Sequence, residues 1–260
     1  MASARVRRPA TLGCRPLCFL SDLLSRFLAF PLFFMDFRVI SIGTMDAHPI
    51  WGERAAVRTP HATTTLIRAG KANILVDPSL PEPALAARLS ERSGLQPQDI
   101  THVFLTCFRP DLRRGIGAFE NAAWLISEPE REGVGVPLVA GLQRAAAEGE
   151  HELKARLELD IAILHRCEPA PDRLAREVAL FPLPGVTPGL SGLLLESRRF
   201  TVLVTGDAIA TGEHLEQPQI VRWAADVARA KESFAEAVEI ADLIVPGRDN
   251  LLVNPTKRPF

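Results

Sequence analysis

Three side chains that could do chemistry follow one another closely at the end of an apolar run. Cys107, Arg109 and Asp111 come directly after HVFLT (102–106), which its apolar character predicts to be a buried strand. A buried strand that runs into a loop is a usual place for functional side chains in an α/β protein. Arg109 could lower the pKa of Cys107 and make it a nucleophile. No histidine with a sensible role as its base is identifiable, which favours a small buried side chain for Cys107.

The sequence around these residues resembles the signature of the metallo-β-lactamase superfamily. In that family a strand that ends in threonine is followed by His-x-His-x-Asp-His, and here the pattern reads Cys107, Arg109, Asp111 and Leu112 at its four defined positions. The resemblance extends over roughly residues 37 to 250, because further family segments follow in the right order. These segments are ILVDPSL (74–80), LPGVTPGLSG (183–192), VTGDAI (204–209) and VPGRDN (245–250).

The resemblance implies a set of metal-ligand positions, which we call the remnant site, and only Asp111 and Asp207 keep the family residue there. The other positions, where the family has histidine, hold Cys107, Arg109, Leu112, Val186 and Arg248, and Leu190 replaces one more histidine of the 183–192 loop. Leucine and valine have no donor atom, and a guanidinium stays protonated and repels a dication. A catalytic zinc needs about three protein donors.

We therefore expect no bound metal, no other cofactor and no working catalytic residue at the remnant site. Zinc or iron is the family-based alternative, with Cys107, Asp111 and Asp207 as a poor set of three ligands.

Loss of the metal would leave the two aspartates without a cation. A buried carboxylate that has no compensating charge costs several kcal/mol. We predict that Arg109 and Arg248 point into the former metal cavity and pair with Asp111 and Asp207, through bidentate hydrogen bonds. A small anionic ligand could bind any guanidinium that is left over, whereas no anion site remains if the aspartates engage both arginines fully.

The elements that must position these residues alternate between β-type and helical patterns, which is typical of an α/β (α+β) protein. Strands are predicted at 37–43, 63–69, 73–79, 102–106, 122–126, 178–184, 192–197, 200–207 and 243–250. Helices are predicted at 81–94, at about 136–164 and over a long stretch that ends at Ala241. The resemblance implies a four-layer αβ/βα sandwich in one domain, residues 35–253, with an extension at 1–34 and a tail at 254–260.

Bulk composition narrows the partners. The 30 lysines and arginines balance the 31 acidic residues, so the chain has no global field for nucleic acid. Four scattered cysteines do not form a disulfide framework, and we expect a reducing cytoplasm. The apolar stretch 17–34 is interrupted by Asp22, Arg26 and Pro31, so we expect no membrane anchor. Met35 opens the first strand of the domain, and we expect the true start there.

Several other side chains are more simply structural than functional. We interpret His48 and His61 as solvated loop histidines near the pocket mouth, and the Arg113–Arg114 pair as a solvated helix start. Asp77 is predicted to cap a turn. The remaining histidines and the tryptophans are assigned to packing or surface positions: His102, His151, His165, His214, Trp51, Trp124 and Trp223.

Three functions fit these observations. The first is a metal-free pseudoenzyme that keeps the cavity as a ligand-binding or regulatory site. The second is a hydrolase of ester, lactone or phosphoester substrates that uses a residual metal site, or Cys107 or Asp207 in place of a metal-bound hydroxide. The third is a purely structural or partner-binding role, for which the helical segment 136–164 is the natural surface.

Overall fold

The computed structural model describes residues 35–257 of the chain. The extension predicted for residues 1–34 lies outside this range, as do the last three residues of the predicted tail. Within the described residues, no helix combines the length and the apolar character that crossing a membrane requires.

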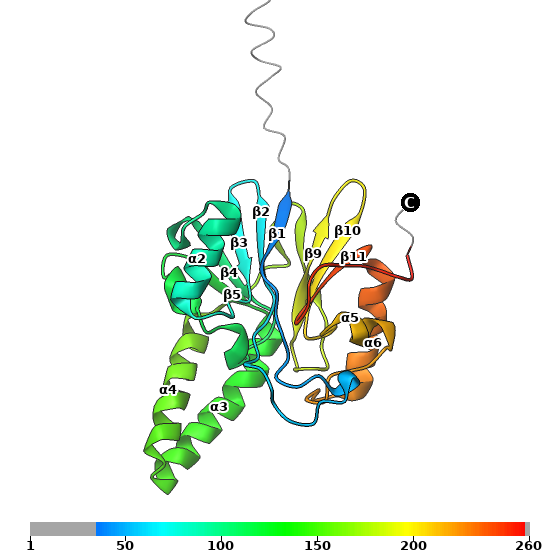
Figure 1. Cartoon of the computed structure of the whole chain (residues 1–260). Helices are drawn as coiled ribbons and strands as arrows, with labels where there is room; N and C mark the ends of the chain where they lie inside the picture. The colour runs from blue at the N-terminus through cyan, green and yellow to red at the C-terminus, as the bar shows by residue number, and fades with distance from the viewer. Residues whose placement is uncertain (1–34, 258–260) are drawn as a thin grey trace, which may run out of the picture. The chain divides into compact units, whose positions relative to one another are not determined.

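Two six-stranded sheets form the centre of the fold (Figure 1). The strands of the first sheet follow chain order, antiparallel from β1 to β3 and parallel from β3 to β6. The second sheet has the order β12-β11-β10-β9-β8-β7, and only β10 and β11 are parallel. The bounds are β1 Asp36–Ser41, β2 Thr64–Ala69, β3 Ala72–Val76, β4 His102–Leu105, β5 Ala123–Ile126, β6 Glu168–Pro169, β7 Arg173–Ala175, β8 Val178–Pro182, β9 Ser191–Glu196, β10 Thr201–Gly206, β11 Leu243–Pro246 and β12 Leu252–Val253.

Alternation along the strands divides the apolar side chains between two faces of each sheet. In β4, Phe104 packs between the two sheets, whereas Val103 and Leu105 face the helical side of the first sheet. In β10, Val204 joins the cluster between the sheets, and Leu203 packs in the cluster that contains α6 residues. This period of two is what a strand covered on both faces requires. The result is the four-layer αβ/βα sandwich that the sequence predicted.

Five α-helices and four short 3-10 helices complete the described chain. The segment 81–94 forms one helix as predicted, with Leu85 and Leu89 fully buried on one face and Gly94 in the left-handed conformation at its end. The bounds are α2 Glu82–Ser93, α3 Glu128–Glu148, α4 His151–Arg166, α5 Gly212–Glu216, α6 Val227–Ile240, η1 Pro49–Trp51, η2 Pro97–Asp99, η3 Pro110–Leu112 and η4 Ile116–Phe119.

The long helix predicted to end at Ala241 is wrong. The structure has the short α5 and the longer α6, separated by a non-helical segment, 217–226, that contains Pro218. Asp226 ends this segment as the N-cap of α6, where its carboxylate accepts a hydrogen bond from the backbone N–H of Arg229. The segment between the helices also carries Trp223 toward the remnant site.

The helical segment predicted at 136–164 consists of two antiparallel helices, α3 and α4, which project from the sandwich (Figure 1). Gly149, in the left-handed conformation, separates them. Gly141 lets the side chain of Leu157 approach the backbone of α3, and the two helices pack closely along this line. The hairpin lies outside the sheets, as expected from the sequence.

Candidate functional site

Loops from both sheets bring the residues of the remnant site together. Asp111 lies in η3, directly after β4 of the first sheet. Asp207 follows the last residue of β10, and Arg248 lies two positions after β11. Because β10 and β11 are parallel neighbours, their carboxyl ends lie at the same edge of the second sheet. Val186 comes from the loop between β8 and β9.

A buried ion cluster occupies the centre of this site. The Nε and Nη2 atoms of Arg248 donate to the two carboxylate oxygens of Asp207, each over 2.8 Å, which is a bidentate pair. Nη1 of Arg248 donates to Oδ2 of Asp111 over 2.6 Å. Arg109 contributes one weaker bond, from Nε to Oδ1 of Asp111 over 3.2 Å. The ion pairs predicted from the sequence are therefore present in the structure.

Arg248 is the central cation of the cluster, and its side chain is 1 % exposed. Burial alone would lower the pKa of this guanidinium, but the charges and hydrogen bonds of Asp207 and Asp111 outweigh burial and raise it. Burial alone would raise the pKa of Asp111, yet Arg248 and Arg109 outweigh it and hold the pKa below its usual value. The geometry thus keeps Arg248 and Asp111 charged inside the protein.

Arg109 is held differently. Its guanidinium lies over the ring of Trp223, 4.8 Å from the ring centroid, and its side chain is 34 % exposed. Its Nε lies 4.0 Å from Oδ2 of Asp207, beyond hydrogen-bond distance. Its two terminal nitrogens make no hydrogen bond with the described part of the chain.

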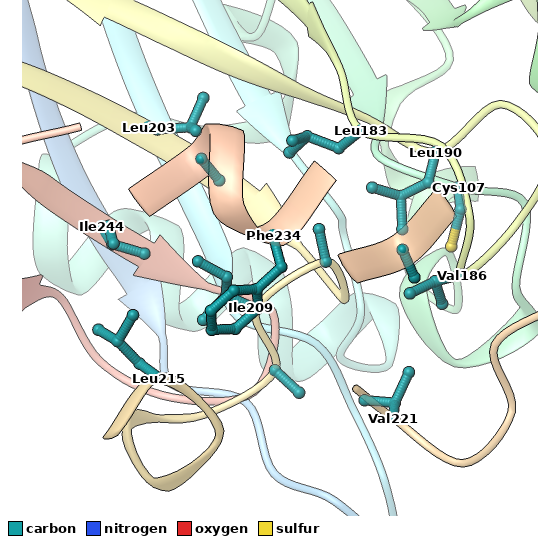
Figure 2. Close-up of a cluster of buried hydrophobic side chains, with 14 of the residues drawn as sticks. Cys107, Leu183, Val186, Leu190, Leu203, Ile209, Leu215, Val221, Phe234 and Ile244 are labelled. Carbon is teal, nitrogen blue, oxygen red and sulfur yellow. The ribbon is translucent and has the colours of Figure 1, made fainter. Parts of the chain in front are cut away.

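The remaining positions of the remnant site have become part of the hydrophobic core. Cys107, Val186 and Leu190 lie together in one apolar cluster (Figure 2), and Leu112 belongs to the same cluster. All four are at most 2 % exposed. Burial, reinforced by the negative charge of Asp207, raises the pKa of the Cys107 thiol well above its usual value. This environment opposes the thiolate that a nucleophile or metal ligand requires.

The donor set does not fit a catalytic zinc ion. Among residues 35–257, no three histidine, cysteine, aspartate or glutamate side chains are grouped so that they could hold a metal. Asp111 and Asp207 supply the only carboxylates of the remnant site, and Arg248 already donates to both oxygens of Asp207 and to one oxygen of Asp111. A dication placed between them would meet a fixed positive charge.

Comparison with known proteins identifies the family of the chain. The family model described as the metallo-β-lactamase superfamily matches residues 58–248. The chain belongs to the metallo-β-lactamase superfamily. It is a divergent member, because the remnant site differs from the family signature at most of its ligand positions. None of the curated proteins matches the chain.

Solved structures of superfamily members share the fold at low sequence identity. A candidate metallo-β-lactamase of Thermotoga maritima is 19 % identical with a TM-score of 0.61, over 84 % of this chain and 99 % of that one. A probable metal-dependent hydrolase of Staphylococcus aureus is 15 % identical with a TM-score of 0.60, over 83 % and 89 %. AiiA of Bacillus thuringiensis, with N-decanoyl-L-homoserine at its active site, is 20 % identical with a TM-score of 0.57, over 83 % and 92 %.

Glu130, a residue that the sequence analysis did not single out, connects two loops of the remnant site through hydrogen bonds. Its carboxylate is fully buried and accepts hydrogen bonds from the backbone N–H groups of Phe108 and Gly189 and from the hydroxyl of Thr187. It thereby joins the loop that carries Asp111 to the loop that carries Val186. A glutamate in the first turn of a helix carries no sequence signal for this role.

The prediction that His48 is a solvated loop histidine is wrong. His48 is 3 % exposed, and its Nε2 lies 3.1 Å from the hydroxyl of Thr211 and 3.4 Å from a carboxylate oxygen of Glu213. Its ring stacks on Trp51 with centroids 4.2 Å apart. His214 contacts the same hydroxyl through Nδ1 over 2.9 Å. This polar cluster fastens the loop between β1 and β2 onto α5, and loop sequence alone does not reveal such long-range contacts.

The prediction that both Arg113 and Arg114 are solvated is correct for Arg114 only. Arg114 is exposed, whereas Arg113 is 6 % exposed and donates to Asp160 of α4 over 2.6 Å. Its guanidinium also lies 4.2 Å from the centroid of the Phe108 ring. Arg113 therefore connects the loop after β4 to the α3–α4 hairpin, a contact between segments far apart in sequence.

Asp77 is structural, as the sequence predicted, but its carboxylate binds Thr106 and does not cap the turn before Pro78. It adopts the left-handed conformation, φ 48°, and is 2 % exposed. Its carboxylate accepts hydrogen bonds from the backbone N–H and the hydroxyl of Thr106, over 2.9 and 2.7 Å. Burial outweighs these bonds and raises the pKa of Asp77 to about 7.

Asp77→Asn is expected to make the protein more resistant to unfolding at pH 8 than the natural protein, with a difference that shrinks as pH falls and is small at pH 4. A carboxyl group whose folded pKa is raised contributes stability below its unfolded pKa, and this is lost as pH rises through the folded value, about 1.4 kcal/mol per pKa unit. Asparagine keeps the hydrogen-bonding shape and tolerates positive φ. Urea unfolding at both pH values measures the effect, with the exposed Asp172→Asn as control. Equal pH profiles for both variants would contradict a pKa near neutrality.

Proposed function

We propose that this protein is a metal-free member of the metallo-β-lactamase superfamily that does not hydrolyse substrates and keeps the remnant site as a ligand-binding or regulatory site. The observation that carries the proposal is the position of Arg248. Its guanidinium forms three hydrogen bonds to Asp111 and Asp207, and thus supplies the positive charge that the two carboxylates need. Relatives such as AidC, described as a dizinc lactonase, hold zinc instead.

The chemistry of the other positions supports the same proposal. A zinc hydrolase needs donors for the ion and an open coordination position for water. Leu112 and Val186 offer no donor atom, and both belong to the same buried apolar cluster, in which Figure 2 labels Val186. Water that is not activated by a metal is a poor nucleophile at neutral pH.

A hydrolase with an altered mechanism is less well supported. Cys107 is fully buried, its thiol pKa is raised, and it packs among apolar side chains. Asp207 is 1 % exposed and both of its oxygens accept bonds from Arg248, so a substrate carbon cannot reach them in this arrangement. Both candidate nucleophiles are therefore shielded from a substrate.

Two buried free cysteines, Cys107 and Cys167, also agree with a reducing cytoplasm as the location.

Metal content tests the proposal directly. We expect the natural protein, purified without chelator and dialysed against zinc or iron at equal ionic strength, to contain well below one metal ion per chain by elemental mass spectrometry. The reason is that Asp111 and Asp207 are paired with Arg248 and the thiol of Cys107 is fully buried, so these three residues are poor metal ligands. A zinc-binding superfamily member treated in parallel is the positive control. Stoichiometric zinc or iron in the natural protein would overturn the proposal and make hydrolase assays the next step.

A further inference from the structure

A small cavity lies beside the ion cluster, and apolar side chains do not fill it. Its volume is about 70 Å³, and Met45, Asp46, Pro60 and Trp223 line it around the charges of the cluster. Because one water molecule accounts for about 30 Å³ of liquid, the cavity has room for two or three non-hydrogen atoms of a ligand inside and more at its mouth. The part of a ligand that enters the cavity must therefore be small.

The two arginines differ in what they can still bind. Arg248 uses Nε, Nη1 and Nη2 on Asp207 and Asp111 and is buried. Arg109 uses only Nε, so the edge formed by its two terminal nitrogens is free of hydrogen bonds to the described residues. That edge belongs to a guanidinium that lines the cavity and lies over Trp223. A planar guanidinium edge held on an aromatic ring matches a carboxylate, which it binds with two parallel bonds.

The charges around the cavity limit the ligand further. Arg109 and Arg248 are balanced by Asp111 and Asp207, so the cluster itself is close to neutral. Asp46 adds an exposed negative charge to the lining. Repulsion from Asp46 grows with the charge of the ligand and is weakest for a single negative charge, which can still accept hydrogen bonds from the two terminal nitrogens of Arg109.

We propose that the cavity binds a small monocarboxylate, held bidentately by the outer edge of Arg109 above the Trp223 ring. This inference rests on the proposed function, because it requires that no metal occupies the site. A monocarboxylate is then the ligand class of the remnant site, and Arg109 is the residue that recognises it.

Sodium acetate is the probe, and the indole N–H of Trp223 is the reporter. The chain has three tryptophans, so the indole region of a ¹H–¹⁵N spectrum of the full chain is simple, and Trp223→Phe identifies the reporter signal. We expect a saturable shift of this signal with a dissociation constant in the millimolar range, as befits four non-hydrogen atoms and one charge-assisted pair. Sodium chloride at equal ionic strength should not reproduce the shift.

Two matched variants test the assignment to Arg109. Arg109→Gln removes the charge at similar length, and we expect affinity for acetate to fall at least tenfold. Arg114→Gln makes the same charge change at an exposed position of the same loop and should leave affinity within twofold. Asp46→Asn should tighten binding. An acetate response that chloride reproduces, or that survives Arg109→Gln, overturns the inference, as does tighter binding of inorganic phosphate than of acetate.

The failure of this inference is distinguishable from failure of the proposed function. Stoichiometric metal in the natural protein overturns the proposed function and this inference together. A metal-free protein that gives no saturable acetate shift overturns only the carboxylate site. The far-ultraviolet circular dichroism and melting temperature of each variant show that it is folded, and Arg109 is 34 % exposed, so its replacement leaves the buried Arg248 pairs in place.

Discussion

Replacing Arg248 by methionine is expected to lower the free energy of unfolding by about 3–5 kcal/mol at pH 7. Methionine fills a similar volume but leaves Asp207 and Asp111 buried with no hydrogen-bond donor from this side chain. Asp207 is 1 % exposed and has no other cation within hydrogen-bond distance among the described residues, since Arg109 lies 4.0 Å away. Urea unfolding of the natural and variant chains measures the difference.

The loss in the free energy of unfolding should depend on pH, and the direction of this dependence identifies its cause. In the natural protein the pKa of Asp111 is lowered, so its contribution to stability is present above the unfolded pKa and is lost as pH falls through the folded value. In Arg248→Met both aspartates lose their main cation, so carboxylates that stay charged at high pH are buried without compensation, and the variant is least stable at high pH and recovers as pH falls. The difference between the two proteins should therefore shrink toward pH 4.

A rescue variant separates unpaired charge from lost packing. Adding Asp111→Asn and Asp207→Asn to Arg248→Met removes the uncompensated charges, and a buried neutral amide costs much less than a buried carboxylate without a cation. We expect this triple variant to regain most of the lost stability at pH 7. Arg114→Met, at an exposed position, is the control for the substitution itself. A pH-independent loss, or no rescue, would show that Arg248 acts through packing and not as the cation of the site.

The ion cluster was predictable from sequence because charge must balance inside a protein. Two family aspartates without histidines at the partner positions require a cation, and the arginines at positions 109 and 248 were the residues available in the same signature. Which arginine binds which aspartate was not predictable from the sequence. Arg248 bridges both aspartates and Arg109 holds only one, because their backbone positions after different strands set which guanidinium reaches the centre.

The strands and most helices were predictable for a related reason. Period-two and helical patterns are local, and in this fold each sheet face and each covering helix is apolar over several residues. The contacts that were missed are polar and long-range. His48 reaches Thr211 and Arg113 reaches Asp160, and no local spacing in the sequence marks either pair. The short edge strands β6 and β12 have two residues each, too few for a pattern.

Restoring two histidines is expected to convert the remnant site into a zinc site. Leu112 and Arg248 occupy family histidine positions, and together with Asp111 and Asp207 the variant Leu112→His, Arg248→His offers four donors. Four nitrogen and oxygen donors satisfy the usual tetrahedral coordination of zinc. We expect about one zinc ion per chain at pH 7.5, measured by elemental mass spectrometry, and its release below about pH 6, where histidine becomes protonated.

The single variant Leu112→His is the decisive comparison, because it adds one donor while the guanidinium of Arg248 stays between the aspartates. If this guanidinium is the built-in cation of the site, Leu112→His should remain free of zinc even at millimolar ion, and zinc should raise the melting temperature of the double variant only. Zinc bound by Leu112→His alone would show that Arg248 yields to a metal and does not replace it. The pair of variants therefore tests whether Arg248, more than the missing histidines, opposes metal binding at the remnant site.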